Sequence, residues 1–207
     1  MKHFFQWLVW LGLGFLLAGC GYNEIQRLDE QVKAAWSQTL NQYERRADLV
    51  PKLVNSVDAY MGQERQVLTE VTEARAQVGQ IRISAQDLDD PALMQRFEQA
   101  QNQLGSALSR LLAVAESYPE LKSDALFQDL MTQLEGTENR IATERGRYVQ
   151  AVQAYNVYIR QFPAVITAKI LGYPVLENYG VDRQHELMRD PEVKFGTSPT
   201  RGASSTQ

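Results

Sequence analysis

The stretch that decides the fold is residues 25–61, IQRLDEQVKAAWSQTLNQYERRADLVPKLVNSVDAYM. Apolar residues recur there every three or four positions: Ile25, Leu28, Val32, Trp36, Leu40, Tyr43, Ala47, Val50, Val54, Val57 and Met61. This spacing places the apolar side chains on one face of a long α-helix. Pro51 predicts a kink or break at residues 48–51, because proline lacks a backbone donor and crowds the preceding turn. Gly62 is a second, weaker point of interruption.

Two more long helices follow a linker near residues 84–89. Asp90-Pro91 is typical of a helix start, with Asp as N-cap and proline in the first turn. That helix runs to Tyr118-Pro119, and Ser123 is the predicted N-cap of the next, which Phe162-Pro163 ends. Residues 24–162 are therefore predicted to form an all-α, elongated antiparallel bundle of three long helices, or of four if the first is split near Pro51.

The remaining 45 residues differ in character. Residues 163–195 are predicted to hold a short helix at 164–171, a turn at Gly172-Tyr173-Pro174 and a loop-like segment. Residues 196–207, rich in Ser, Thr and Gly, are predicted to be a disordered tail.

The N-terminus carries a short basic start and an apolar run at residues 4–18. This run is shorter than the roughly 20 residues that cross a bilayer, and it suits the h-region of a signal peptide. It ends in Leu17, Ala18, Gly19 and Cys20, which resembles the lipobox of bacterial lipoproteins. The resemblance implies that residues 1–19 are removed and that Cys20 receives diacylglycerol and palmitate-type chains, so that residues 20–23 form a lipidated N-terminus. The alternative is a short anchor, residues 4–19, that stays uncleaved.

Either form tethers the chain to a membrane of the bacterial envelope, and the lipobox implies the periplasmic face. Gly21 is not the Asp that retains lipoproteins in the inner membrane, which favours the outer membrane. Without residues 1–19 the net charge is about −5, so the lipid and not a basic surface is expected to attach the protein.

Composition excludes several functions. The whole chain has 21 Lys+Arg against 25 Asp+Glu, which gives no reason to expect nucleic acid. One Cys excludes an intrachain disulfide, and two His leave too few ligands for most protein-built metal sites. His185-Glu186 fails as a zinc motif because Arg189 stands where the second His belongs. No catalytic residue, metal or cofactor is predicted.

Some polar residues fall on or near the apolar stripes. Arg45, Arg46 and Asp48 precede Pro51, where Arg side chains would bind freed carbonyls or pair with an acid such as Glu138; a partner docking at the kink is the alternative. Further candidates for a polar core or a docking site are Glu64, Arg75, Glu138 and Arg140. Three interpretations stay open for the stripe residues: heads that reach solvent, a buried polar layer that fixes helix register, or a partner site. Tyr158 and Tyr179 lie off the stripe and are candidate interface aromatics.

Several strings resemble one family. The most specific are RRADLVPKLV at residues 45–54 and EGTENRI at residues 135–141, and YPELK at 118–122 follows the same order. These strings are similar to the LemA family of bacterial envelope proteins, over about residues 22–173. The resemblance implies a helical bundle behind an N-terminal membrane anchor, with no established catalytic activity. Family members commonly keep an uncleaved transmembrane helix, whereas this chain has a lipobox.

The leading hypothesis is a lipid-anchored, non-enzymatic bundle that acts as a scaffold or interaction module for another envelope protein. One alternative is an envelope enzyme that uses carboxylates in a bundle cleft. The other is a structural rod that self-associates through its long stripes.

Overall fold

A computed structural model describes the backbone of residues 2–61 and 64–178, and the side chains of residues 21–61 and 64–178. Its elements are α1 (Lys2–Asp58), α2 (Arg65–Gln80), α3 (Pro91–Ala115), α4 (Pro119–Lys122), α5 (Ala125–Arg160) and α6 (Ala164–Leu171). The described residues hold helices and connecting segments but no strand. The prediction of an all-α bundle is confirmed.

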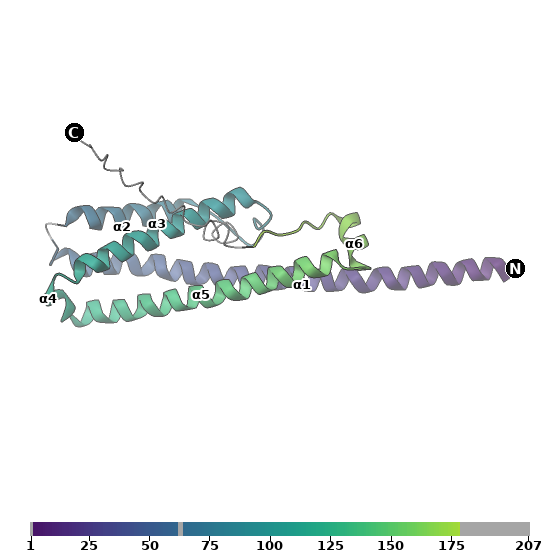
Figure 1. The fold of residues 1–207 in the computed structure, drawn as a ribbon, viewed down its shortest axis with the longest axis horizontal. Coiled ribbons are helices and arrows are strands. Elements are labelled where there is room, and N and C mark those ends of the chain that lie inside the picture. The colour runs from purple at the N-terminus through teal and green to yellow at the C-terminus, as the bar shows by residue number, and fades with distance from the viewer. Residues whose placement is uncertain (1, 62–63, 179–207) are drawn as a thin grey trace, which may run out of the picture.

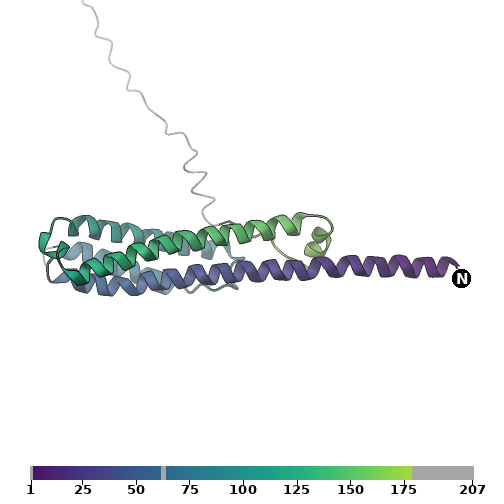
Figure 2. The ribbon, with the colours of Figure 1, turned by 90° about the horizontal axis from the view of Figure 1, so that it is seen from below.

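The bundle is long and narrow (Figure 1). α1 and α5 lie side by side and antiparallel in both ribbon views, and α6 packs against both at one end (Figures 1 and 2). The hairpin of α2 and α3 covers the half of this pair that lies away from α6 (Figure 1). α1 continues beyond the α6 end of the bundle. Within the described part of the chain, no helix is both long and apolar enough to cross a membrane.

Of the kink or break predicted at residues 48–51, the break is wrong. α1 passes through Pro51 and ends at Asp58, so the turn to α2 falls at residues 59–64, around Gly62. Proline removes only one backbone donor, and the carbonyl that loses it, on Ala47, accepts a hydrogen bond of 3.0 Å from Nε of Arg75. The buried Val50, Leu53 and Val57 hold the helix on both sides of the proline. Four long helices therefore form, with the division nearer to residue 62.

Helix caps account for the other boundaries. Asp90 accepts a hydrogen bond from the backbone N–H of Leu93, with Pro91 in the first turn of α3, as predicted. The N-cap of α5 is Asp124 and not Ser123: Asp124 accepts from the N–H of Phe127, whereas Ser123 closes the short α4 by donating to backbone carbonyls. The predicted short helix at 164–171 is α6, and Gly172, at φ 74°, ends it in the left-handed conformation.

The buried apolar residues form two clusters along the bundle. The distal core lies at the α4 end and is built from α1, α2, α3 and α5, with Val50, Val57, Val71, Leu104 and Leu111 among its most buried members. The proximal core lies toward α6 and is built around Trp36, Tyr43, Phe97, Tyr148 and Tyr155. It is closed by Leu88 from the α2–α3 linker and by Leu176 after α6.

Candidate functional site

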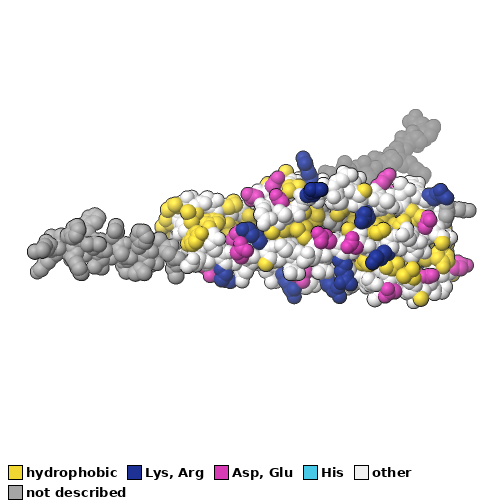
Figure 3. Space-filling view, turned by 180° about the vertical axis from the view of Figure 1, so that it is seen from behind, with side chains coloured by type: hydrophobic (Ala, Val, Ile, Leu, Met, Phe, Trp, Pro, Cys, Tyr) yellow, Lys and Arg dark blue, Asp and Glu magenta, His cyan; other side chains and the backbone are white. Residues whose placement is uncertain are grey.

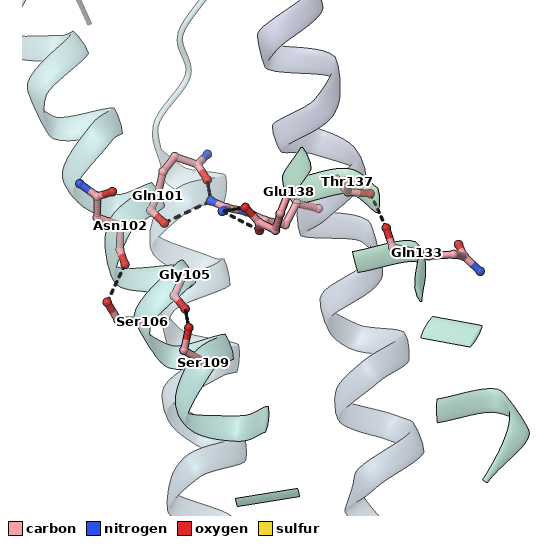
Figure 4. A network of polar contacts seen from close by, with 9 residues as sticks. Gln101, Asn102, Gly105, Ser106, Ser109, Gln133, Thr137 and Glu138 are labelled. Carbon is pink, nitrogen blue, oxygen red and sulfur yellow. Dashed lines mark hydrogen bonds and ion pairs between the residues drawn. The ribbon is translucent and has the colours of Figure 1, made fainter. Parts of the chain in front are cut away.

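A buried polar layer separates the two cores, and its centre is Arg46 of α1, which hydrogen-bonds to Gln101 and Glu138. Figure 4 shows these two partners on opposite sides of the layer. Arg46 is only 4% exposed. One guanidinium nitrogen donates to both carboxylate oxygens of Glu138 on α5, at 3.0 and 3.3 Å. The other donates to the backbone carbonyl of Gln101 on α3, at 3.1 Å, and to the Gln101 side-chain oxygen. The layer thus ties three helices together at one level.

Neighbouring contacts complete this layer. The guanidinium carbon lies 5.2 Å from the centroid of the Tyr43 ring, within the range of a cation–π interaction. Thr137 is fully buried and donates to the carbonyl of Gln133 in its own helix, at 2.7 Å. A planar guanidinium has donors in fixed directions, so it can hydrogen-bond to its partners in only a few geometries. The layer therefore sets how α1, α3 and α5 are aligned.

The other polar candidates lie outside this layer. Arg75 binds the Ala47 carbonyl, and Glu64 sits half-buried at the N-cap of α2, where its side chain makes no capping hydrogen bond. Arg45, Asp48 and Arg140 are exposed. Of the sequence candidates, the structure therefore brings Arg46 and Glu138 together and leaves the rest at the surface or at helix ends.

A groove of about 760 Å³ lies next to the layer, between α1, α2, α3 and the linker of residues 81–90. Its apolar lining residues include Leu40, Tyr43, Ile81, Ile83 and Phe97, and its polar ones include Glu44, Arg75, Arg82, Asp87 and Gln101. Gln101 is 4% exposed, and its amide nitrogen has no hydrogen-bond partner among the described residues. The groove thus combines an apolar lining with charged residues of both signs, which suits an amphipathic segment of a partner.

Tyr155 and Asn156 fix the segment that follows α6. The Asn156 amide donates to the carbonyl of Leu176 at 2.7 Å and accepts from its N–H at 2.9 Å, so it replaces a backbone partner. The Tyr155 hydroxyl donates to the carbonyl of Pro174 at 3.1 Å. Burial raises the pKa of Tyr155 and of Tyr148 to about 12, because the apolar surroundings disfavour the charged form.

The N-terminal end of the described side chains packs closely on α6. A Cβ built on Gly21 would lie 3.6 Å from the Cα of Ala164 and 3.7 Å from the hydroxyl oxygen of Thr167. Gly21 directly follows the predicted lipid site, Cys20, whose own side chain is outside the described residues. The first residue after the predicted anchor is thus already part of the packed bundle.

Of the two candidate interface aromatics, Tyr158 lies within the described residues. Tyr158 is half-buried and lines a shallow hollow of about 430 Å³ between α1 and α5. Tyr179 and the segment around His185 lie outside the described residues. Within the described part, no three His, Cys, Asp or Glu side chains gather closely enough to hold a metal ion.

Sequence reasoning missed Gln101, Asn156 and the contact of Gly21 with α6. Gln101 follows the apolar Ala100 within α3, and nothing local distinguishes it from the exposed glutamines nearby. Asn156 could have been identified from the sequence, because it directly follows Tyr155 of the apolar stripe. A side-chain amide buried at such a position needs hydrogen-bond partners from another segment.

These features define an all-α bundle with an internal polar layer that ties α1, α3 and α5 together. The chain belongs to the LemA family: the sequence model of that family matches residues 35–195, most of the chain. This agrees with the resemblance found in residues 45–54 and 135–141.

Three curated proteins share part of this sequence. Two, the magnetosome proteins MamQ 2 and MamQ 1 of Paramagnetospirillum magneticum, are 40% identical over 75 residues. The magnetosome protein MamQ of Magnetospirillum gryphiswaldense is 36% identical over the same length. The aligned part is 36% of this chain and 28% of each relative, so the similarity spans a minor part of those proteins.

Proposed function

We propose that this protein is a lipid-anchored, non-enzymatic scaffold of the bacterial envelope that holds a helical bundle at the periplasmic face of a membrane. The observation that carries the proposal is the lipobox-like cysteine, Cys20, placed directly before Gly21, which packs on α6. Membership of the LemA family supports it. Absence of Asp at position 21 favours the outer membrane over the inner.

The scaffold would act by position. Two or three acyl chains on Cys20 anchor a protein stably, whereas a single chain binds only marginally. The groove beside Gln101 is the surface that we assign to an envelope protein partner, which would pack apolar side chains on its apolar lining. The carboxylate of Glu138 is paired with Arg46 in an ion pair. A carboxylate held in this way suits the alignment of helices better than acid–base chemistry.

The anchor is tested by the mass of the full chain expressed in a bacterium with lipoprotein processing. The expected mature protein begins at Cys20 and carries diacylglycerol and acyl groups. Globomycin, which blocks the lipoprotein signal peptidase, and Cys20→Ala should each leave residues 1–19 attached. A wild-type chain that keeps residues 1–19 and a free Cys20 thiol would overturn the lipoprotein proposal.

The docking surface is tested by a photoreactive amino acid at Arg82, which lines the groove, with Arg140 as the control. Both residues are exposed arginines, but Arg140 lies on α5 away from the groove. A defined protein adduct in cells from position 82, absent from position 140, is expected. Equal adducts from both positions would contradict the assignment of the groove.

A further inference from the structure

One end of the bundle exposes a group of large apolar side chains, which we call the α6 patch: Phe162, Ile166, Ile170, Leu171 and Val175. Phe162 is 82% exposed and Ile170 is 77% exposed. Figure 3 shows hydrophobic side chains at one end of the described surface, while along the rest of this face hydrophobic and charged side chains are interspersed. Contiguous apolar patches of this kind mark contact with another apolar surface.

The architecture of α6 explains why these residues are not buried. Ala164 and Ala168 form its buried face and let it approach α1 and α5 closely. Ile166 and Ile170 are one helical turn apart and share a face that is directed away from that contact. Elsewhere, an exposed aliphatic residue such as Leu126 stands at the opposite end, at the start of α5.

The position of the patch identifies what covers it. Gly21 of α1 packs on Ala164 and Thr167 of α6. Because Gly21 directly follows Cys20, the α6 helix lies next to the proposed attachment point. A membrane that holds the chain at Cys20 therefore lies beside the α6 patch. This is true whether the chain is lipidated there or keeps residues 4–19 as an anchor.

We infer that the α6 patch inserts into the interfacial region of the lipid bilayer and forms a second, non-covalent membrane contact next to the anchor. The inference rests on the proposed membrane attachment near residue 20. An amphipathic helix at an interface buries its apolar face into the boundary between headgroups and acyl chains. Lys169, exposed between Ile166 and Ile170, is placed to meet lipid phosphates.

The test uses the full chain reconstituted in vesicles of phosphatidylethanolamine and phosphatidylglycerol. An environment-sensitive fluorescent amino acid replaces Ile170 in one variant and Leu126 in the matched control. Both positions carry exposed aliphatic side chains, so neither substitution removes core packing. Lipids with a nitroxide group just below the headgroup then serve as the quencher.

The expected result is a blue-shifted emission at position 170 that loses most of its intensity to the nitroxide lipids, with little loss at position 126. Equal, weak quenching at both positions in vesicle-bound protein would overturn the inference. A blue shift at position 170 without quenching would also overturn it, because a second copy or residues 179–207 would then cover the patch. Mass spectrometry of the same preparation shows whether Cys20 carries acyl groups. A failure of the lipoprotein proposal can therefore be told apart from a failure of this inference.

Discussion

The two cores of the bundle both fill the space between α1 and α5, but they do so with different kinds of side chain. In the distal core four helices lie together, and the buried residues described there are aliphatic apart from Met61 and Phe127. In the proximal core the α2–α3 hairpin gives way to the linker, and Trp36 contacts Phe97 and Tyr148 with ring centroids 5.8 and 5.1 Å apart. Where fewer helices surround α1 and α5, larger side chains and non-helical segments fill the space.

Because of this difference, single substitutions should affect the stability of the two cores to different extents. Small aliphatic residues can adjust to each other, whereas a cluster of aromatic rings depends on each member for its edge-to-face contacts. The proximal core is also the part that holds α6 and its exposed patch. The four predictions that follow challenge this comparison, beginning with the largest expected effect.

Trp36→Ala should lower the free energy of unfolding by about 3–5 kcal/mol, because it opens a large cavity and removes two ring contacts. Leu104→Ala, in the distal core, should cost about 2–4 kcal/mol. Both side chains are fully buried, so exposure does not differ between them. Denaturant unfolding followed by far-UV circular dichroism compares them. A larger loss for Leu104→Ala would contradict the greater dependence of the proximal core on single residues.

Alkaline pH should weaken the proximal core through Tyr148. Its pKa is about 12 in the folded protein and about 10 when unfolded, so the unfolded chain loses the proton first. Stability is therefore complete below pH 10 and falls as the pH rises to 12, by roughly 2–3 kcal/mol for this residue. Denaturant midpoints measured across this range should show the fall.

Tyr148→Phe is the matched variant. The hydroxyl of Tyr148 is buried without a hydrogen-bond partner in the described residues, so its removal should leave stability at neutral pH equal or slightly higher. Above pH 10 the variant should lose less stability than wild type. Identical pH profiles for the two proteins would show that another group causes the alkaline loss.

Arg46→Ala should cost about 2 kcal/mol, because it leaves the Gln101 acceptors buried without their charged donor. Glu138→Gln should cost under about 1 kcal/mol, since the Glu138 side chain is 44% exposed and water can replace the lost charge interaction. Arg46→Met, which joins the two cores with an apolar side chain, should be milder than Arg46→Ala. Chemical denaturation of the three variants ranks them. A loss for Glu138→Gln as large as that for Arg46→Ala would mean that the ion pair, and not the Gln101 contacts, stabilises the layer.

Arg75→Ala should have the smallest effect, about 0.5–1 kcal/mol, because Arg75 is exposed and donates one hydrogen bond to Ala47. The same substitution in a Pro51→Ala background should cost almost nothing, because an alanine N–H at position 51 would bind the Ala47 carbonyl instead. Equal losses in both backgrounds would show that Arg75 does not compensate for the proline.

Most of the fold follows from periodicity. The apolar stripes from Ile25 to Ile159 place the helices, and Asp90-Pro91 marks a helix start because capping is a local interaction. The break at Pro51 was predicted wrongly because its compensation is not local. Arg75 reaches Ala47 from a different helix, 28 positions along the chain.

The polar layer was only half predictable. Arg46 and Glu138 are charged residues near or on a stripe, which marks them as candidates, and they pair in the structure. Gln101 shows no such signal, since its burial depends on how the α2–α3 hairpin docks on α1. The α6 patch was missed for a related reason. From the sequence, a short apolar helix is expected to be buried, and only the packing shows which of its faces has no neighbour.

With the proposed anchor at Cys20, the close packing of Gly21 on α6 would leave no flexible tether between the membrane and the bundle. At 1.5 Å per residue, α1 carries its far end, Asp58, about 55 Å from Gly21. A protein on a loose linker explores a whole hemisphere, whereas a stiff rod clamped at its base confines its tip to a thin shell at one height. Any partner at that height meets the tip at a high effective concentration, and a partner at another height does not meet it at all.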